Sequence, residues 1–240
     1  MKKKIVIFSG AGLDAPSGVE TFRSNGGLWN NHRVEDVATP EGWRKNRQMV
    51  LDFYNQRRRQ LSEVFPNEAH KTIVKLEEYF DVTNVTQNIS DLLERAGASN
   101  IIHLHGELTK ARSSLYEHKT TPIDQIVNIG YNDINIGDKC SITGSQYRPH
   151  IVWFGEYPFG VDEAYSAINN ANILIIIGTS LQIGYTLTML SSVNENCKVF
   201  YIDPKPMNYL DNYGLTVEYI KKDAIEGMNE LYDKINNNEI

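Results

Sequence analysis

The chain has 240 residues with a formal net charge of −6 at pH 7 and 41% hydrophobic residues, and its mean hydropathy is −0.40. This length allows one substantial core and a small additional module, and the acidic balance argues against a surface that coats nucleic acid. No stretch approaches the ~20 apolar residues that span a bilayer, and Lys2–Lys4 lead into an apolar run too short for a signal peptide. We therefore expect a cytoplasmic protein that binds neither a membrane nor a specific nucleic acid.

The first predicted element is a strand at residues 5–8, which runs directly into Gly10-Ala11-Gly12. A strand that ends in Gly-x-Gly before a helix presents backbone N–H groups and the positive end of a helix dipole to an anion such as a pyrophosphate. Glycines at such a turn can also serve only to reach positive φ. From these three residues alone, both interpretations stay open.

Further apolar runs typical of strands lie at residues 82–85, 101–104, 151–154, 173–177 and 199–202, with helical patterns between several of them. Their hydrophobicity is continuous rather than alternating, which suits parallel strands covered on both faces. We therefore predict an α/β fold with a doubly wound, mostly parallel, Rossmann-like sheet.

Two segments interrupt this pattern. One contains a helix at about residues 46–61, and the other is polar and irregular. Insertions of this kind often form a module over the carboxyl edge of the sheet. We predict a core of residues 1–23, 66–108 and 148–240, and a small module of residues 24–65 and 109–147.

Polar residues follow the predicted strands. After the second strand, Gln87 and Asn88 can bind ribose hydroxyls without adding charge, although a helix cap would look similar. His105 ends the third strand and precedes a glycine, which suits a general base with a pKa near neutrality. His103 lies two residues earlier and is interpreted as a structural imidazole. Asp203 follows the strand at 199–202, where a carboxylate can bind ribose hydroxyls or cap a helix.

Longer strings carry a family resemblance. The string Gly-Ala-Gly-x₄-Ser-Gly-x₂-Thr-Phe-Arg at residues 10–23 resembles the nucleotide-binding signature of the sirtuins, the NAD-dependent protein deacylases. The family's other strings follow in order: Thr-Gln-Asn-Ile at 86–89, Leu-His-Gly at 104–106, Val-Trp-Phe-Gly-Glu at 152–156 and Gly-Thr-Ser at 178–180. The chain most resembles the bacterial class III branch, which removes succinyl and malonyl groups from lysine; this likeness is carried by residues 27–29, 36–41 and 53–59.

The resemblance implies NAD as cofactor and acylated lysine side chains of cellular proteins as substrates, with His105 and Asn88 as the catalytic residues. It assigns the peptide substrate to a strand formed by Val152, Trp153, Phe154 and Gly155. It assigns the dinucleotide to Gly10, Ala11, Gly12, Thr21, Phe22, Arg23, Trp29, Gln87, Asn88, Ile89, Ser90, Gly178, Thr179, Ser180, Asp203 and Ala224.

Tyr54 and Arg57 lie three residues apart on the predicted helix and therefore share a face. A guanidinium beside a phenol suits the terminal carboxylate of an acidic acyl chain, although a core tyrosine and a solvated arginine would give the same spacing. Resemblance to the class III Tyr-x-x-Arg pattern favours the first interpretation. We therefore expect removal of succinyl or malonyl groups in addition to, or better than, acetyl groups.

The chain also departs from the sirtuin pattern. Sirtuins typically hold a structural zinc with two Cys-x-x-Cys pairs, whereas this chain has only Cys140 and Cys197 and so lacks the four ligands of a closed site. We expect no zinc. The family's serine after Gly-Ala-Gly-x is Asp14 here, and its aspartate after Thr-Gln-Asn-Ile is Ser90; both touch the dinucleotide pocket and leave open how well NAD binds or turns over.

Two other functions fit the same residues. An NAD hydrolase or ADP-ribosyltransferase would also keep Asn88 and His105. A non-catalytic sensor of NAD or ADP-ribose would suit Asp14, Ser90 and the missing cysteines.

Overall fold

The computed structural model describes residues 2–19, 28–29, 32–115, 121–182, 184–207 and 210–237, with the backbone alone for 28–29 and 211–212. Three residues assigned to NAD from the sequence, Thr21, Phe22 and Arg23, lie outside these ranges, as does the side chain of Trp29.

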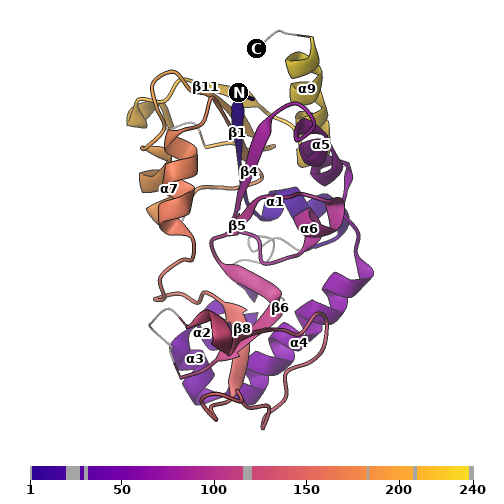
Figure 1. Ribbon diagram of the computed structural model, residues 1–240, viewed down its shortest axis with the longest axis vertical. Helices are drawn as coiled ribbons and strands as arrows, with labels where there is room; N and C mark the ends of the chain where they lie inside the picture. Colours follow the sequence, from indigo (N-terminus) through magenta and orange to yellow (C-terminus); the bar gives the residue numbers. More distant parts are fainter. Residues whose placement is uncertain are drawn as a thin grey trace.

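The core is a sheet of six parallel strands in the order β11-β10-β9-β1-β4-β5 (Figure 1). The strand order reverses between β1 and β9, and ligands of open α/β sheets bind at such a switch point. The predicted doubly wound α/β fold is confirmed. The strands are β1 (Lys4–Ser9), β4 (Asp81–Thr86), β5 (Ile101–His103), β9 (Ile173–Ile177), β10 (Lys198–Ile202) and β11 (Val217–Ile220).

Helices cover both faces of this sheet, which explains the continuous apolar runs. In β1, Ile5 and Ile7 pack on the face covered by α5 (Glu68–Leu76) and α9 (Ala224–Asn236). The alternate side chains, Val6 and Phe8, pack on the face covered by α7 (Val161–Asn169) and α8 (Gly184–Leu190). Figure 1 shows α7 on one side of β1 and β4, and α5 and α9 on the other.

Two strand assignments differ from the sequence prediction. The run at 151–154 is not a core strand: β8 (Tyr147–Ile151) pairs antiparallel with β6 (Gly106–Ser113) in a three-stranded sheet completed by β7 (Ile126–Asn128). β11 was missed because Val217-Glu218-Tyr219-Ile220 alternates in polarity, as suits the edge position that it occupies.

The small sheet packs with α2 (Val34–Val37), α3 (Pro40–Lys45) and α4 (Arg47–Glu63) below the core (Figure 1). Asn46 caps α4 by accepting a hydrogen bond from the Met49 amide at 3.1 Å, so the predicted helix is present with a longer carboxyl end. Trp43, Tyr54 and Trp153 are fully buried at the centre of this module. The small sheet includes residues 106–108 and 148–151, which the sequence prediction placed in the core. We keep the division of the chain into a core and a small module as a proposal.

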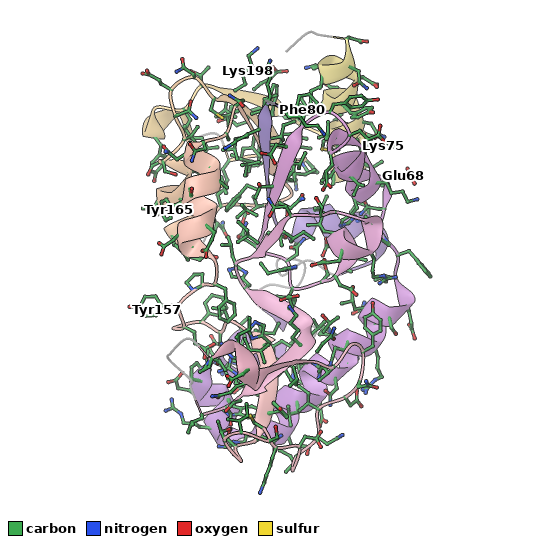
Figure 2. The ribbon with its side chains drawn as sticks, in the orientation of Figure 1. Glu68, Lys75, Phe80, Tyr157, Tyr165 and Lys198 are labelled. Atoms are coloured by element: carbon green, nitrogen blue, oxygen red, sulfur yellow. The ribbon has the colours of Figure 1, made fainter. Side chains whose placement is uncertain are left out.

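No helix among the described residues combines the length and apolarity needed to cross a membrane. Side chains along both modules are drawn in Figure 2, where Tyr157, 86% exposed, stands out from the segment between β8 and α7. The short elements are α1 (Ala11–Asp14), η1 (Ala15–Ser17), β2 (Leu28–Trp29), β3 (His32–Arg33), α6 (Leu92–Ala96), η2 (Ile123–Gln125) and η3 (Leu210–Tyr213).

Candidate active site

Two glycine-containing turns meet at the switch point of the sheet. The Gly10 amide donates to the Ile177 carbonyl at 3.0 Å, and the Gly12 amide donates to the Gly178 carbonyl at 2.8 Å. A Cβ on Gly12 would lie 2.6 Å from the Cα of Gly178, so the two turns approach each other too closely for a side chain. The helix that follows, α1, has only four residues. The dipole that this short helix offers to an anion is therefore small.

The two carboxamides predicted to bind ribose lie at this edge, and both are half-buried. Gln87 donates through Nε2 to Thr179 Oγ1 at 2.9 Å, which links the ends of β4 and β9. Asn88 donates through Nδ2 to the Gly10 carbonyl at 3.0 Å, and its own amide donates to Thr86 Oγ1. These bonds fix both side chains without any charge. Ser180 and Ile89 follow these residues and are half-buried.

His105 lies between the large and small sheets, and its two ring nitrogens have different partners. Nδ1 is 2.8 Å from the Gln87 carbonyl, which can only accept, so Nδ1 carries the proton. Nε2 therefore keeps its lone pair and lies 2.5 Å from the Tyr185 hydroxyl. Burial lowers the pKa of His105 below its ordinary value of 6.5, against the smaller raising effect of the Gln87 bond. The ring is thus neutral and basic at Nε2 near pH 7.

His103, by contrast, has both ring nitrogens bonded within the protein. Its ring nitrogens bond the Asn88 carbonyl at 3.1 Å and the Glu94 carboxylate at 2.7 Å. Burial alone would lower the pKa of His103, but the hydrogen bond and charge of Glu94 raise it overall. Among the described residues, His103, Glu94 and Glu107 have ligand atoms within 4.8 Å of one another, but ion pairs with each other and with Lys110 account for this cluster.

The two departures in the dinucleotide pocket contact each other. Ser90 donates through Oγ to Asp14 Oδ2 at 2.6 Å, and Asp14 Oδ1 lies 3.1 Å from His70 Nε2. All three residues are buried. The Asn67 amide donates to His70 Nδ1 at 3.3 Å, which leaves the proton on Nε2 and directs it to Asp14. Asp14 and Ser90, which stand where the sirtuin pattern has a serine and an aspartate, thus bond each other as carboxylate and hydroxyl.

The predicted adenosine contacts lie further along the sheet. Asp203 follows β10, is half-buried, and accepts a hydrogen bond from the Lys205 amide at 2.8 Å. Ala224 begins α9 and is buried in the core. Asp223, and not Asp203, caps α9. Asp203 Oδ1 accepts from the Lys205 amide, and its other carboxylate oxygen is left for a ligand.

The predicted peptide-binding segment adjoins His105. The Val152 amide donates to the His105 carbonyl at 2.9 Å, and the Phe154 amide donates to the Ala38 carbonyl at 3.0 Å. Trp153 is buried, whereas Phe154 is 52% exposed and Gly155 is exposed. Gly106 makes this approach possible: its φ is +83°, and a Cβ there would lie 2.0 Å from the His150 carbonyl oxygen.

The buried side chain of Glu156 anchors the same segment. It accepts a hydrogen bond from the Trp153 amide at 2.8 Å and pairs with Arg148 at 2.6 Å and Arg112 at 3.0 Å. Arg148 also lies over the Trp153 ring, 3.2 Å from its centroid. The segment is therefore fixed to the small sheet by a carboxylate shared between two guanidinium groups.

The predicted acyl-binding pair comes from the middle of α4. The Trp153 indole donates to the Tyr54 hydroxyl at 3.1 Å, and burial raises the pKa of Tyr54 well above its ordinary value of 10. Arg57 is half-buried, with its guanidinium over the Phe53 ring at 5.3 Å. Tyr54 thus contacts the peptide-binding segment, and Arg57 follows one turn later. The adjacent arginines point elsewhere, since Arg58 bonds Leu108 and Asn55, and Arg59 pairs with Asp133.

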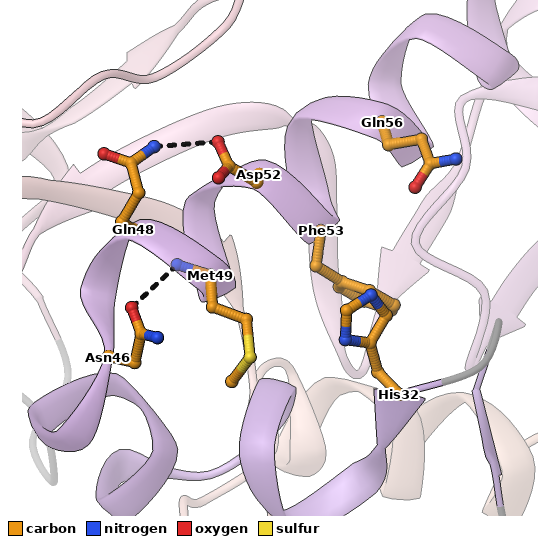
Figure 3. Close-up of a pocket in the computed structure, with 7 residues that line it drawn as sticks. All are labelled: His32, Asn46, Gln48, Met49, Asp52, Phe53 and Gln56. Atoms are coloured by element: carbon orange, nitrogen blue, oxygen red, sulfur yellow. Dashed lines mark hydrogen bonds between the residues drawn. The ribbon is translucent and has the colours of Figure 1, made fainter.

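A second feature of α4 is a surface pocket of about 300 Å³. Figure 3 shows His32 against Phe53 at its wall, with a ring separation of 5.5 Å. Neither Tyr54 nor Arg57 lines it, so this pocket is distinct from the predicted acyl site. Its lining residues are His32, Asn46, Gln48, Met49, Asp52, Phe53 and Gln56.

Comparison with known proteins identifies the family. Residues 10–184 match the Sir2 family. The chain belongs to the Sir2, or sirtuin, family. An NAD-dependent protein deacylase of Helicobacter pylori strain J99 is 45% identical over 97% of this chain and 95% of that protein. Another of the same name from Bacteroides thetaiotaomicron is 43% identical over 95% of this chain and 96% of that protein.

Solved structures of Sir2 homologues have a similar fold. A mutant Sir2 homologue in complex with ADP-ribose has a TM-score of 0.85 and 30% identity, covering 99% of this chain and 93% of the homologue. A Sir2 homologue in complex with NAD has a TM-score of 0.82 and 29% identity, covering 99% and 91%.

The residues at the sheet edge of this Sir2 chain fit NAD. The carboxamides of Gln87 and Asn88 and the hydroxyl of Thr179 lie at the carboxyl ends of β4 and β9, and the neutral imidazole of His105 follows β5 and bonds the Gln87 carbonyl. These uncharged groups suit the hydroxyls of a ribose. The Sir2 zinc region gives the opposite result. Ser113 Oγ lies 2.9 Å from Thr143 Oγ1 and 2.7 Å from Ser145 Oγ, so hydroxyls bond one another beside Cys140 where a zinc would need thiolates or imidazoles.

Sequence reasoning missed three residues of this Sir2 site. Tyr185 contacts His105, which lies 80 residues away in the chain. His70 contacts Asp14 at a separation of 56 residues, and Glu156 contacts Trp153 at a separation of 3. Only Glu156 carried a signal, since it ends the string Val-Trp-Phe-Gly-Glu.

Proposed function

We propose that the chain is an NAD-dependent protein lysine deacylase that acts in the cytoplasm. The observation that carries the proposal is the tautomer of His105: the Gln87 carbonyl holds the proton on Nδ1, so Nε2 is a neutral base at the sheet edge. The same residue is one backbone hydrogen bond from the peptide-binding segment. Base and substrate strand therefore adjoin each other. Membership of a family with NAD-dependent deacylases at 45% identity supports this reaction.

When bound, NAD supplies the ADP-ribose that accepts the acyl group, with nicotinamide as leaving group. His105 takes a proton from a ribose hydroxyl at Nε2. Gln87 and Asn88 would orient the ribose through their uncharged carboxamides. The amides of Val152, Trp153 and Phe154 already donate within the protein, so residues 152–155 would bind the peptide through their carbonyls and the Gly155 amide. Backbone hydrogen bonds of this kind give affinity with little sequence selectivity.

For the acyl group, we propose an acidic chain such as succinyl or malonyl. The Arg57 guanidinium would receive its carboxylate, and Tyr54 would form the wall beside Trp153. A guanidinium over an aromatic ring is partly desolvated, which strengthens a charge-assisted contact.

One incubation tests the reaction. The purified chain is given NAD and either an acetyl-, a succinyl- or a malonyl-lysine peptide, and the products are separated by mass spectrometry. O-acyl-ADP-ribose formed in step with free lysine peptide is the expected result. ADP-ribose released without peptide would instead make the chain an NAD hydrolase, and NAD binding without product would make it a sensor. A higher kcat/KM on acetyl-lysine than on both acidic peptides would contradict the acyl assignment alone.

A further inference from the structure

Tyr185 occupies the nitrogen that the proposed reaction needs. Its hydroxyl lies 2.5 Å from His105 Nε2, with the rings edge to face, 6.0 Å apart and at 86°. Because Nδ1 already donates to the Gln87 carbonyl, Nε2 has a lone pair and no proton. The phenol is therefore the donor. Burial raises the pKa of Tyr185 above its ordinary value of 10, so it remains a donor throughout the physiological range.

We infer that Tyr185 gates the general base: its hydrogen bond blocks His105 Nε2 and must break before His105 can accept a proton from the substrate. The inference rests on the proposed function, because it assumes that Nε2 is the base. One lone pair cannot accept from two donors with good geometry. A ribose hydroxyl and the Tyr185 hydroxyl therefore compete for Nε2.

A strained residue lies near the start of α8. Tyr185 is the second residue of α8 and is half-buried. Leu181 lies between β9 and α8 and has a φ of +54°. This is the left-handed region, which is unfavourable for a residue with a side chain such as leucine. Among the described residues, Leu181 is the single non-glycine residue with a positive φ. A shift of the first turn of α8 would relieve this strain while releasing Nε2, so the two changes favour each other.

The segment is also linked to the nucleotide edge. Thr179, at the carboxyl end of β9, accepts from the Leu181 amide at 3.3 Å and from Gln87 Nε2 at 2.9 Å. A ligand that draws on Thr179 or Gln87 would therefore disturb the segment that holds Tyr185. Dinucleotide binding would thereby favour the open state of the gate.

The pH dependence of the base reports the contact. Two groups of the described residues hydrogen-bond the His105 ring: the Gln87 carbonyl after β4 and the Tyr185 phenol on α8. No charged side chain contributes to the pKa of His105 among these residues. A donor to the lone pair stabilises the neutral ring, so its removal should raise the pKa of His105.

The test compares Tyr185→Phe, which removes only the hydroxyl, with Tyr232→Phe, which alters a half-buried tyrosine on α9. Histidine resonances are titrated by NMR in the whole chain without substrate, with His105→Gln to assign the signal. Tyr185→Phe should raise the pKa of His105 and leave the other histidines unchanged, whereas Tyr232→Phe should change none. An unshifted His105 pKa in Tyr185→Phe would overturn the contact. The titration needs no turnover, so this result stands even if the proposed function fails.

Kinetics then separate a gate from other roles. On an acyl-lysine peptide at mildly alkaline pH, where His105 is neutral in both proteins, Tyr185→Phe should raise kcat/KM by about 3- to 10-fold, the worth of one hydrogen bond that substrate no longer has to break. Its acid limb should also move to higher pH. A fall in kcat would mean that Tyr185 relays the proton and would overturn the gate, as would an unchanged kcat/KM.

Discussion

The sheet edge holds Gln87, Asn88 and His105 through uncharged hydrogen bonds, whereas the small module holds the peptide-binding segment through buried charges. Gln87, Asn88 and His105 are fixed by backbone carbonyls and a hydroxyl. The peptide-binding segment is fixed by Glu156 between two arginines. No charged side chain of the described residues contributes to the pKa of His105, which is therefore set by burial and hydrogen bonding. A module whose zinc ligands are missing gains order from ion pairs, which burial makes costly to break.

The largest effect is expected at the sheet edge, from His105→Ala. Loss of the base should lower kcat for deacylation by about 10²-fold or more, while NAD binding stays near normal because the carboxamides and glycine turns remain. Steady-state kinetics and calorimetry measure the two quantities. Because burial lowers the pKa of His105, the kcat/KM of the unaltered protein should fall only as the pH drops below about 6.5. Near-normal turnover in the variant would break the assignment.

The small module should respond most to Glu156→Gln. The substitution keeps the size of the side chain but leaves two guanidinium groups buried without a counter-charge, at a cost of about 3 kcal/mol in the free energy of unfolding. Burial, and then the charge of Arg148, already lowers the pKa of Arg112 to about 10. Urea unfolding measures the loss. Asp133→Asn, which breaks the exposed pair with Arg59, is the control and should cost less than about 1 kcal/mol. Equal losses would remove the contrast between the two pairs.

Arg57→Met tests whether the small module also selects the acyl group. Desuccinylation should fall by about one to three orders of magnitude, as expected for a lost charge-assisted contact of roughly 1.5–4 kcal/mol, while deacetylation changes much less. Arg59→Met removes a neighbouring cation that pairs with Asp133 and should affect neither reaction. Equal losses on both substrates would place Arg57 in folding or NAD binding instead.

The pair of Asp14 and Ser90 at the sheet edge should show coupling. Asp14→Ser alone leaves Ser90 and His70 without their buried acceptor and should cost about 1–3 kcal/mol of unfolding free energy. Ser90→Asp alone places two carboxylates together. The double variant restores a hydroxyl beside a carboxylate and should cost less than the sum of the two single changes. Additive losses in the unfolding cycle would show that the two positions act independently, and NAD titration of the same proteins measures the effect on affinity.

The smallest effect concerns metal. Protein purified without added metal should contain far less than one zinc per chain, and a strong chelator should leave its melting temperature unchanged, because hydroxyls occupy the family's zinc region. Elemental analysis and thermal unfolding check this. A stoichiometric zinc that resists chelation would overturn the view that ion pairs order the small module.

The parts of this site that the sequence predicted are those set by local chemistry. Continuous apolar runs located five of the six core strands, and polar residues after them located Gln87 and His105. The alternating β11 lacked that signal. Tyr185 meets His105, and His70 meets Asp14, because the fold packs α8 beside the end of β5 and α5 beside α1. The residue types alone do not predict these partners. Run 151–154 was placed in the wrong sheet because an apolar run does not say which strand it pairs with.

The position of His105 in the chain has a mechanical consequence. β5 of the large sheet ends at His103, and β6 of the small sheet begins at Gly106, so the base sits on the backbone crossing between them. When one rigid body rocks against another, displacement grows with distance from the pivot and is smallest at the pivot itself. Rocking of the small module about this crossing would sweep the far end of α4 through a long arc yet barely displace the imidazole. His105 would keep its alignment with the sheet edge while the far end of the small module moves.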